Sequence, residues 1–187
     1  MVVLDVDTGR KTELSGGAVD LSANGRFVVY LTGLSSGANA LHIYDHRTKT
    51  SSPVTVPVNG ENVAVIVVGQ DSNSMQKVSI SGDGRYIAFV TRQALVPGDN
   101  NGRIDAYVYD REEHRVALAS ARKNGTAAPG LNEVWNPEIS ADGHYIAFKS
   151  YYDFIDETQD GGNWGFITTN PLYEAGYCAG YSEFGAQ

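Results

Sequence analysis

The sequence lacks most of the features by which enzymes and nucleic-acid-binding proteins are recognised. It has a single cysteine, Cys178, so no intrachain disulfide can form. Its 187 residues carry 14 Lys and Arg against 22 Asp and Glu, a formal net charge of −8, and the basic residues form no run. Binding to a nucleic-acid backbone requires a basic face, so we expect no nucleic-acid partner.

Long apolar segments are also missing. The longest apolar stretch, Val63–Val68, is far too short to cross a bilayer, so we expect no membrane insertion. The first residues, Met1–Asp5, have neither the basic region nor the apolar core of a signal peptide. No segment shows sustained helical periodicity, whereas Gly (21 residues) and Tyr (11 residues) are frequent, which favours an all-β chain rich in turns.

Internal repeats organise the chain. Three segments of 11 residues share a pattern of Ser, Asn or Asp, Gly, and then an aromatic and aliphatic run; they begin at Asp20, Ser79 and Glu138. Their turn glycines, Gly25, Gly84 and Gly143, are 59 residues apart both times. Asn-Gly and Asp-Gly permit a tight reversal, so each segment predicts a hairpin whose second strand is buried. These second strands place Val28, Tyr30, Ile87, Phe89, Ile146 and Phe148 in or beside the interfaces between units.

A second pair of strands follows each hairpin. One strand ends in Asp, at Ile43–Asp45 and Val108–Asp110, and another follows at Val54–Val56 and Val116–Leu118. Four strands in each unit are typical of a β-propeller blade. The predicted fold is therefore all-β, with four-stranded antiparallel blades in a partial or open propeller of about three blades.

The repeat phase sets the domain organisation. Blade repeats occupy 1–150, as a half blade at 1–15, a blade at 17–57, a blade at 76–120 and the start of a blade at 134–150. Residues 151–187 hold the divergent remainder of the third blade, with a candidate strand at Trp164–Thr168, and an unpatterned tail. Val63–Val68, between the two full blades, predicts an extra strand.

The repeats resemble those of a known family. Ile80–Phe89, Leu95–Gly102 and Asp105–Asp110 are together similar to the repeats of TolB-like, WD-type β-propellers of bacteria. The resemblance covers about residues 1–150 and implies no single activity. It implies a binding scaffold or an accessory domain of a larger protein, in a periplasmic or extracellular compartment.

One loop carries a candidate metal site. Gly98–Asp105 places the oxygen side chains of Asp99, Asn101 and Asp105 around a glycine turn, and Ca²⁺ prefers such ligands. The spacing departs from an EF-hand loop, and no distal Glu follows. The alternative is a polar loop in which Asp105 caps a strand. The acidic segment Asp153–Asp160 is more typical of a solvated loop than of a site.

Motifs for catalysis are absent. The sequence has no Gly-x-Ser-x-Gly elbow and no phosphate-binding Gly-x-x-x-x-Gly-Lys loop, and no His lies near Cys178. We therefore expect a non-catalytic segment that binds a protein, peptide or glycan through its loops. One alternative is the accessory propeller of a larger hydrolase of the prolyl-oligopeptidase type, with the catalytic domain outside this chain; another is a cation-dependent adhesin. Both main hypotheses imply further blades or a second domain in the parent protein.

Overall fold

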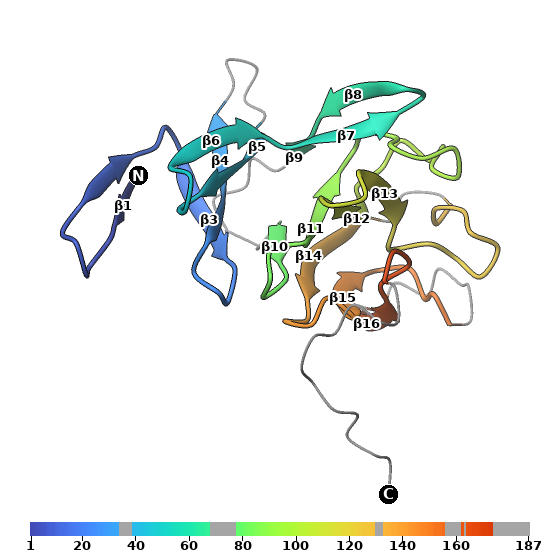
Figure 1. The fold of residues 1–187 in the computed structure, drawn as a ribbon. Helices are drawn as coiled ribbons and strands as arrows, with labels where there is room; N and C mark the ends of the chain where they lie inside the picture. The colour runs from blue at the N-terminus through green and yellow to red at the C-terminus, as the bar shows by residue number, and fades with distance from the viewer. Residues whose placement is uncertain (34–38, 68–77, 130–132, 156–161, 163, 174–187) are drawn as a thin grey trace, which may run out of the picture.

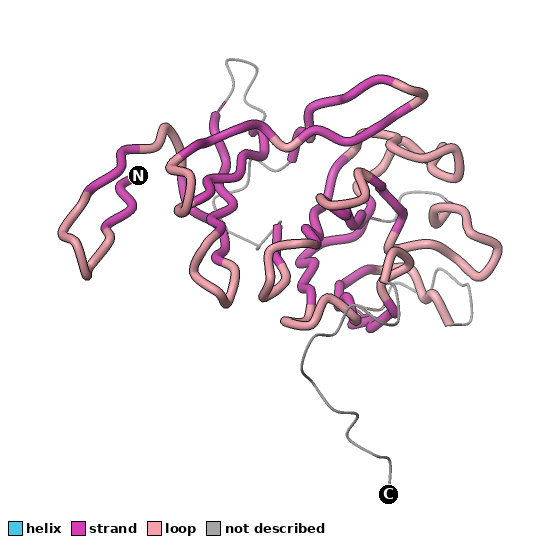
Figure 2. The backbone as a smooth tube through the Cα atoms, viewed as in Figure 1, coloured by secondary structure: helices cyan, strands magenta, loops and turns pink. Residues whose placement is uncertain are grey.

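The computed structural model describes residues 1–33, 39–67, 78–129, 133–155, 162 and 164–173. Within these residues the chain consists of strands and loops and has no helix, as Figure 2 shows. It accordingly has no helix of the length and hydropathy that crossing a membrane requires in the described part. The predicted all-β fold class is confirmed. Cys178 and most of the acidic segment after Asp153 lie outside the described residues.

The second unit of the repeat is a complete blade. Its four strands are β10 (Val78–Ile80), β11 (Tyr86–Thr91), β12 (Asp105–Asp110) and β13 (Arg115–Leu118). They form an antiparallel sheet in the order β10-β11-β12-β13, the up-and-down order of a propeller blade.

The first unit has the same order with a different outer strand. Strands β3 (Gly17–Leu21), β4 (Phe27–Gly33), β5 (Asn39–Asp45) and β6 (Thr50–Pro53) follow one another in its sheet. The prediction that Val54–Val56 forms the fourth strand is wrong, because β6 takes that place. All of β6 is exposed, so it lacks the apolar pattern by which a strand is recognised, whereas Val54 and Val56 are buried in the core.

Two short strands, β8 (Glu61–Ala64) and β9 (Ile66–Val67), occupy the described part of the single extra strand predicted between the blades. β7 (Thr55–Val58) and β8 form a hairpin, and β9 returns to pair with β5. Val65 separates β8 from β9 and donates its backbone N–H to the carbonyl of Val54 at 3.0 Å. The single strand predicted at Val63–Val68 is corrected accordingly.

Incomplete sheets lie at the two ends of the described chain. β1 (Val2–Leu4) and β2 (Lys11–Glu13) form a two-stranded sheet. β14 (Val134–Ile139), β15 (Tyr145–Ser150) and β16 (Trp164–Thr169) form a three-stranded one. In Figure 1 the sheets follow one another in chain order along an arc, with the β1 hairpin at one end and β14–β16 at the other.

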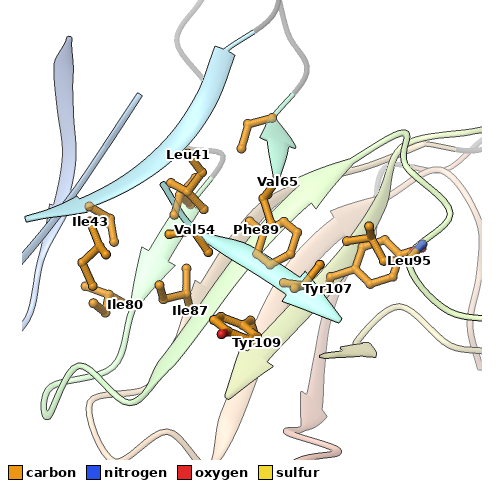
Figure 3. Close-up of a cluster of buried hydrophobic side chains, with 14 of the residues drawn as sticks. Leu41, Ile43, Val54, Val65, Ile80, Ile87, Phe89, Leu95, Tyr107 and Tyr109 are labelled. Atoms are coloured by element: carbon orange, nitrogen blue, oxygen red, sulfur yellow. The ribbon is translucent and has the colours of Figure 1, made fainter. Parts of the chain in front are cut away.

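The core lies between the blades. One cluster joins the first and second blades and includes Ile43, Ile87, Phe89 and Tyr107, seen in Figure 3. A second cluster joins the second blade to β14–β16, and a third joins β4 and β5 to the β1–β2 sheet. The prediction of core positions is confirmed, since all six residues are buried in these clusters: Val28, Tyr30, Ile87, Phe89, Ile146 and Phe148.

An ion pair closes each full blade and explains the strands that end in Asp. Arg85, directly after the turn glycine, meets Asp110 at the end of β12 with 2.7 Å between Nη2 and Oδ2, and both side chains are buried. Arg26 and Asp45 repeat the pair at 2.7 Å in the first blade, where hydrogen bonds from Arg26 lower the pKa of Asp45 to about 2. In the third sheet His144 stands at the Arg position, and Thr169 pairs with Tyr145 where Asp110 pairs with Tyr86.

Candidate binding cleft and acidic loop

A cleft of about 760 Å³ separates the β7–β8 hairpin from the second blade. The hairpin forms one wall because Asn59 and Gly60 both adopt positive φ, which gives a tight reversal. The loop after β11 and the start of β13 form the other wall. The residues that line the cleft on these elements are Pro57, Val58, Asn59, Ala94, Leu95, Val96, Pro97, Asp99, His114, Arg115 and Val116.

The lining combines an apolar surface with a few polar groups. Leu95 is buried in the same cluster as Phe89 and Tyr107, so the blade core supports this wall. The exposed side chains of His114 and Arg115 supply hydrogen-bond donors at the rim, and His114 Nδ1 lies 2.9 Å from the hydroxyl of Tyr109. Such a lining suits a ligand with an apolar body and a polar or anionic group.

The three predicted metal ligands do lie together, in the loop that leads from this cleft into β12. Asp105 Oδ2 accepts a hydrogen bond of 2.8 Å from Asn101 Nδ2, and Asp105 Oδ1 accepts one of 3.1 Å from Ser120. Asp99, which also lines the cleft, accepts a hydrogen bond at its Oδ2 from the hydroxyl of Tyr107. Both carboxylates are buried.

Burial raises the pKa values of two of these side chains, Asp105 and Tyr107. Desolvation raises the pKa of Asp105 to about 6; the charge of Asp99 adds to the rise, while the hydrogen bonds from Asn101 and Ser120 oppose it. Desolvation and the bond to Asp99 likewise raise the pKa of the Tyr107 phenol, which keeps this hydroxyl a donor. The loop is thus held by donors that surround two carboxylates.

The geometry bears on the calcium hypothesis without testing it. Asn101 turns its amide nitrogen toward Asp105, while its Oδ1 accepts the backbone N–H of Arg103 at 2.7 Å. A cation would have to replace donors that the loop now supplies. Among the described residues there is no group of three or more His, Cys, Asp or Glu side chains that could hold a metal ion. The calcium site of Asp99, Asn101 and Asp105 stays a prediction.

The sheets therefore define blades of a β-propeller, and known structures agree. No family model and no curated protein matches this sequence. Among solved structures, the tricorn protease matches with a TM-score of 0.53 and 16% identity, over 89% of this chain and 15% of that one. TolB from Acinetobacter baumannii matches with a TM-score of 0.51 and 15% identity, over 91% of this chain and 35% of that one.

The chain has a TolB-like β-propeller fold, and the predicted resemblance is confirmed at the level of fold. It spans about a third or less of the length of these two proteins.

Sequence reasoning missed the cleft although one signal for it was present. Asn59-Gly60 between two β-prone segments is the pattern of a two-residue hairpin. That pattern predicts the hairpin but not its position, since the packing of β7 beside β13 depends on the stacking of two blades.

Proposed function

We propose that this chain is a non-catalytic propeller segment that binds a protein, peptide or glycan in the cleft between the β7–β8 hairpin and the second blade. The observation that carries the proposal is the cleft itself, with its apolar surface and the exposed Arg115 and His114 at its rim. Loops on a rigid scaffold are where recognition sites concentrate, and the buried core behind Leu95 makes the scaffold rigid.

A second candidate is the accessory propeller of a larger hydrolase of the prolyl-oligopeptidase type. The fold match to a region of the tricorn protease, which covers only 15% of that chain, favours it. The catalytic residues would then lie outside this chain, with further blades or a second domain in the parent protein. The coding sequence that flanks this segment distinguishes the two candidates, because the hydrolase requires a Ser-His-Asp set there.

A binding experiment tests the cleft. The labelled chain is applied to peptide and glycan arrays, and each ligand found is titrated by isothermal calorimetry. We expect Val58→Asp, which places a charge on the apolar wall, to weaken binding about tenfold or more. The matched control, Ile167→Asp, changes an exposed residue on another blade and should leave affinity unchanged. Equal affinity for wild type and Val58→Asp would remove the cleft from consideration.

A further inference from the structure

The dipeptide Asn-Gly recurs within the described residues, in turns and loops at Asn24-Gly25, Asn59-Gly60, Asn101-Gly102 and Asn124-Gly125. An Asn side chain in this dipeptide can lose its amide as ammonia, because Gly has no Cβ to obstruct attack by its own backbone nitrogen. That nitrogen must first approach the side-chain carbonyl carbon of Asn, and hydrogen bonds that hold either group in place prevent the approach. The structure therefore decides which of these pairs can react.

The pair Asn24-Gly25 is held at both reacting groups. Asn24 Oδ1 accepts the Ser22 hydroxyl at 2.7 Å and the backbone N–H of Arg26 at 3.0 Å. Asn24 Nδ2 donates to the carbonyl of Asp83 on the next blade at 3.0 Å. The N–H of Gly25, which would have to attack, donates to the carbonyl of Ser22 at 2.8 Å. Several hydrogen bonds must therefore break before this pair reacts.

Two further pairs are held in the same way. Asn101 Nδ2 donates to Asp105 at 2.8 Å and to a backbone carbonyl at 2.9 Å. Asn124 Oδ1 accepts the backbone N–H of Thr126 at 3.1 Å and its hydroxyl at 2.8 Å. The N–H of Gly125 is bound as well, by a backbone carbonyl at 2.8 Å.

The pair Asn59-Gly60 differs from the other three. Both residues are exposed at the tip of the β7–β8 hairpin, and in the part of the chain that the structure describes neither the Asn59 side chain nor the Gly60 N–H has a hydrogen-bond partner. Their φ values of 51° and 86° keep the turn closed, so the hairpin must open locally before the groups meet. β7 and β8 form a two-stranded sheet, which is the least stable kind, so this opening costs little.

We propose that Asn59 is a site of spontaneous deamidation that alters the wall of the cleft. The backbone nitrogen of Gly60 bonds to Cγ of Asn59, the Cγ–Nδ2 bond breaks, and the amide nitrogen leaves as ammonia with the proton of the attacking N–H. Water then adds to either carbonyl of the cyclic imide and opens it, which gives aspartate or isoaspartate. Water is the only co-reactant, and nothing is oxidised or reduced.

Both products change the cleft. Asn59 lines it together with His114 and Arg115, so either product adds a carboxylate to a rim where the exposed Arg115 supplies positive charge. Isoaspartate also inserts an extra carbon into the backbone, which a two-residue turn cannot hold while Val58 stays opposite Glu61. The consequence for ligand binding rests on the proposed function, whereas the modification itself does not.

Peptide mapping by mass spectrometry, after the intact chain has been stored in mildly alkaline buffer, tests the modification. In the folded chain Asn59 should convert at least about tenfold faster than Asn24, Asn101 or Asn124, because hydrogen bonds must break first at those positions. In urea that unfolds the chain all four should convert at similar rates, since each is followed by Gly.

Two variants separate the cause from the consequence. Thr126→Val removes a hydrogen bond that holds Asn124, so conversion at Asn124 should accelerate while conversion at Asn59 stays the same. Asn59→Gly removes the reactive amide and keeps a pair that suits the turn. On storage, hydrogen exchange of the wild type should show lost protection over Glu61–Ala64, whereas Asn59→Gly should exchange as it did when fresh.

Equal conversion of the four asparagines in the folded chain, or no conversion at Asn59, would overturn the proposal. Conversion at Asn59 with unchanged protection of the hairpin would overturn its effect on the cleft wall. Neither readout uses a ligand, so a failure to find one on the arrays would count against the proposed function and not against this modification.

Discussion

Asp105 is a buried carboxylate whose ionisation works against the fold. Its pKa in the folded chain is about 6, above the ordinary 3.8, so the folded state binds a proton more tightly than the unfolded state does. The stability that this group contributes is complete below about pH 4 and is lost as the pH rises through 6. The buried or paired carboxylates of Asp45 and Asp110 have lowered pKa values and act in the opposite direction, at lower pH.

We therefore predict that unfolding free energy falls by about 1.4 kcal/mol between about pH 5 and pH 8 through Asp105. Urea denaturation at several pH values measures it. In Asp105→Asn, which does not ionise, this part of the pH dependence should vanish even if the loss of the bond from Asn101 lowers stability overall. A variant with the pH profile of the wild type would show that Asp105 is not the group responsible.

Ile87 tests the core between the first two blades. Its side chain is fully buried on β11, in the cluster with Ile43 and Phe89. Ile87→Ala leaves a cavity that neighbouring β-sheets cannot collapse to fill, so unfolding free energy should fall by about 2–5 kcal/mol. The control Ile167→Ala, at a residue that is 76% exposed, should change it by less than about 0.5 kcal/mol. Equal denaturation midpoints for the two variants would contradict the assignment of Ile87 to the core.

At the scale of the elements, two turn glycines distinguish the cost of local backbone strain from the cost of disturbing the packing between blades. Gly25 and Gly84 have φ of 70° and 80°, so alanine is strained at both. Only Gly84 also holds an aromatic ring of the preceding blade. We predict that Gly25→Ala costs about 1 kcal/mol and that Gly84→Ala costs about 1–3 kcal/mol more, because Phe27 must move. Chemical denaturation measures both, and equal costs would mean that the ring contact contributes little.

Such elements also show how far the sequence predicts the structure. The second strands and their turns were predictable because Asx-Gly followed by an apolar run specifies a hairpin locally. β6 was not, because an outer strand with all four residues exposed has no apolar pattern. The cleft could not be predicted either, since it depends on how separate sheets stack. The positions of Asp99, Asn101 and Asp105 in one loop followed from their spacing, but the direction of the Asn101 amide did not.

The loop from Asp99 to Asp105 gives the calcium prediction a direct test. A cation that binds only the folded state raises the melting temperature by mass action. If the loop binds Ca²⁺, calcium should raise the melting temperature of the wild type but not of Asp99→Ala. The rise should be larger at about pH 8 than at about pH 5, because Asp105 must be ionised to bind a cation. No shift in the wild type at either pH would leave the polar loop as the explanation.

At the scale of the whole molecule, the arc of blades has two apolar end faces. Inside the arc, the residues equivalent to Tyr145 are Phe27 and Tyr86, and the next blade covers both. Tyr145 itself is exposed beside Ile167 on the last sheet. At the other end Val2, Leu4 and Val6 are exposed on and beside β1. Terminal repeats of stacked architectures usually carry polar outer surfaces, and these do not.

We predict that the isolated chain self-associates through the face of the β14–β16 sheet that carries Tyr145 and Ile167. The repeat pattern buries the equivalent apolar side chains elsewhere in the arc. Covering them here with a second molecule lowers the free energy by about 25 cal/mol for each Å² removed from water. Size-exclusion chromatography with light scattering should show a mass that rises with concentration above 20.1 kDa. Ile167→Asp should shift the chain toward monomer, because its carboxylate opposes desolvation of that face, whereas Lys11→Ala, on the exposed surface of β2, should not. A wild-type chain that remains a compact monomer at all concentrations would show that these end faces are stable in water, and the inference of missing neighbouring blades would then lose its physical basis.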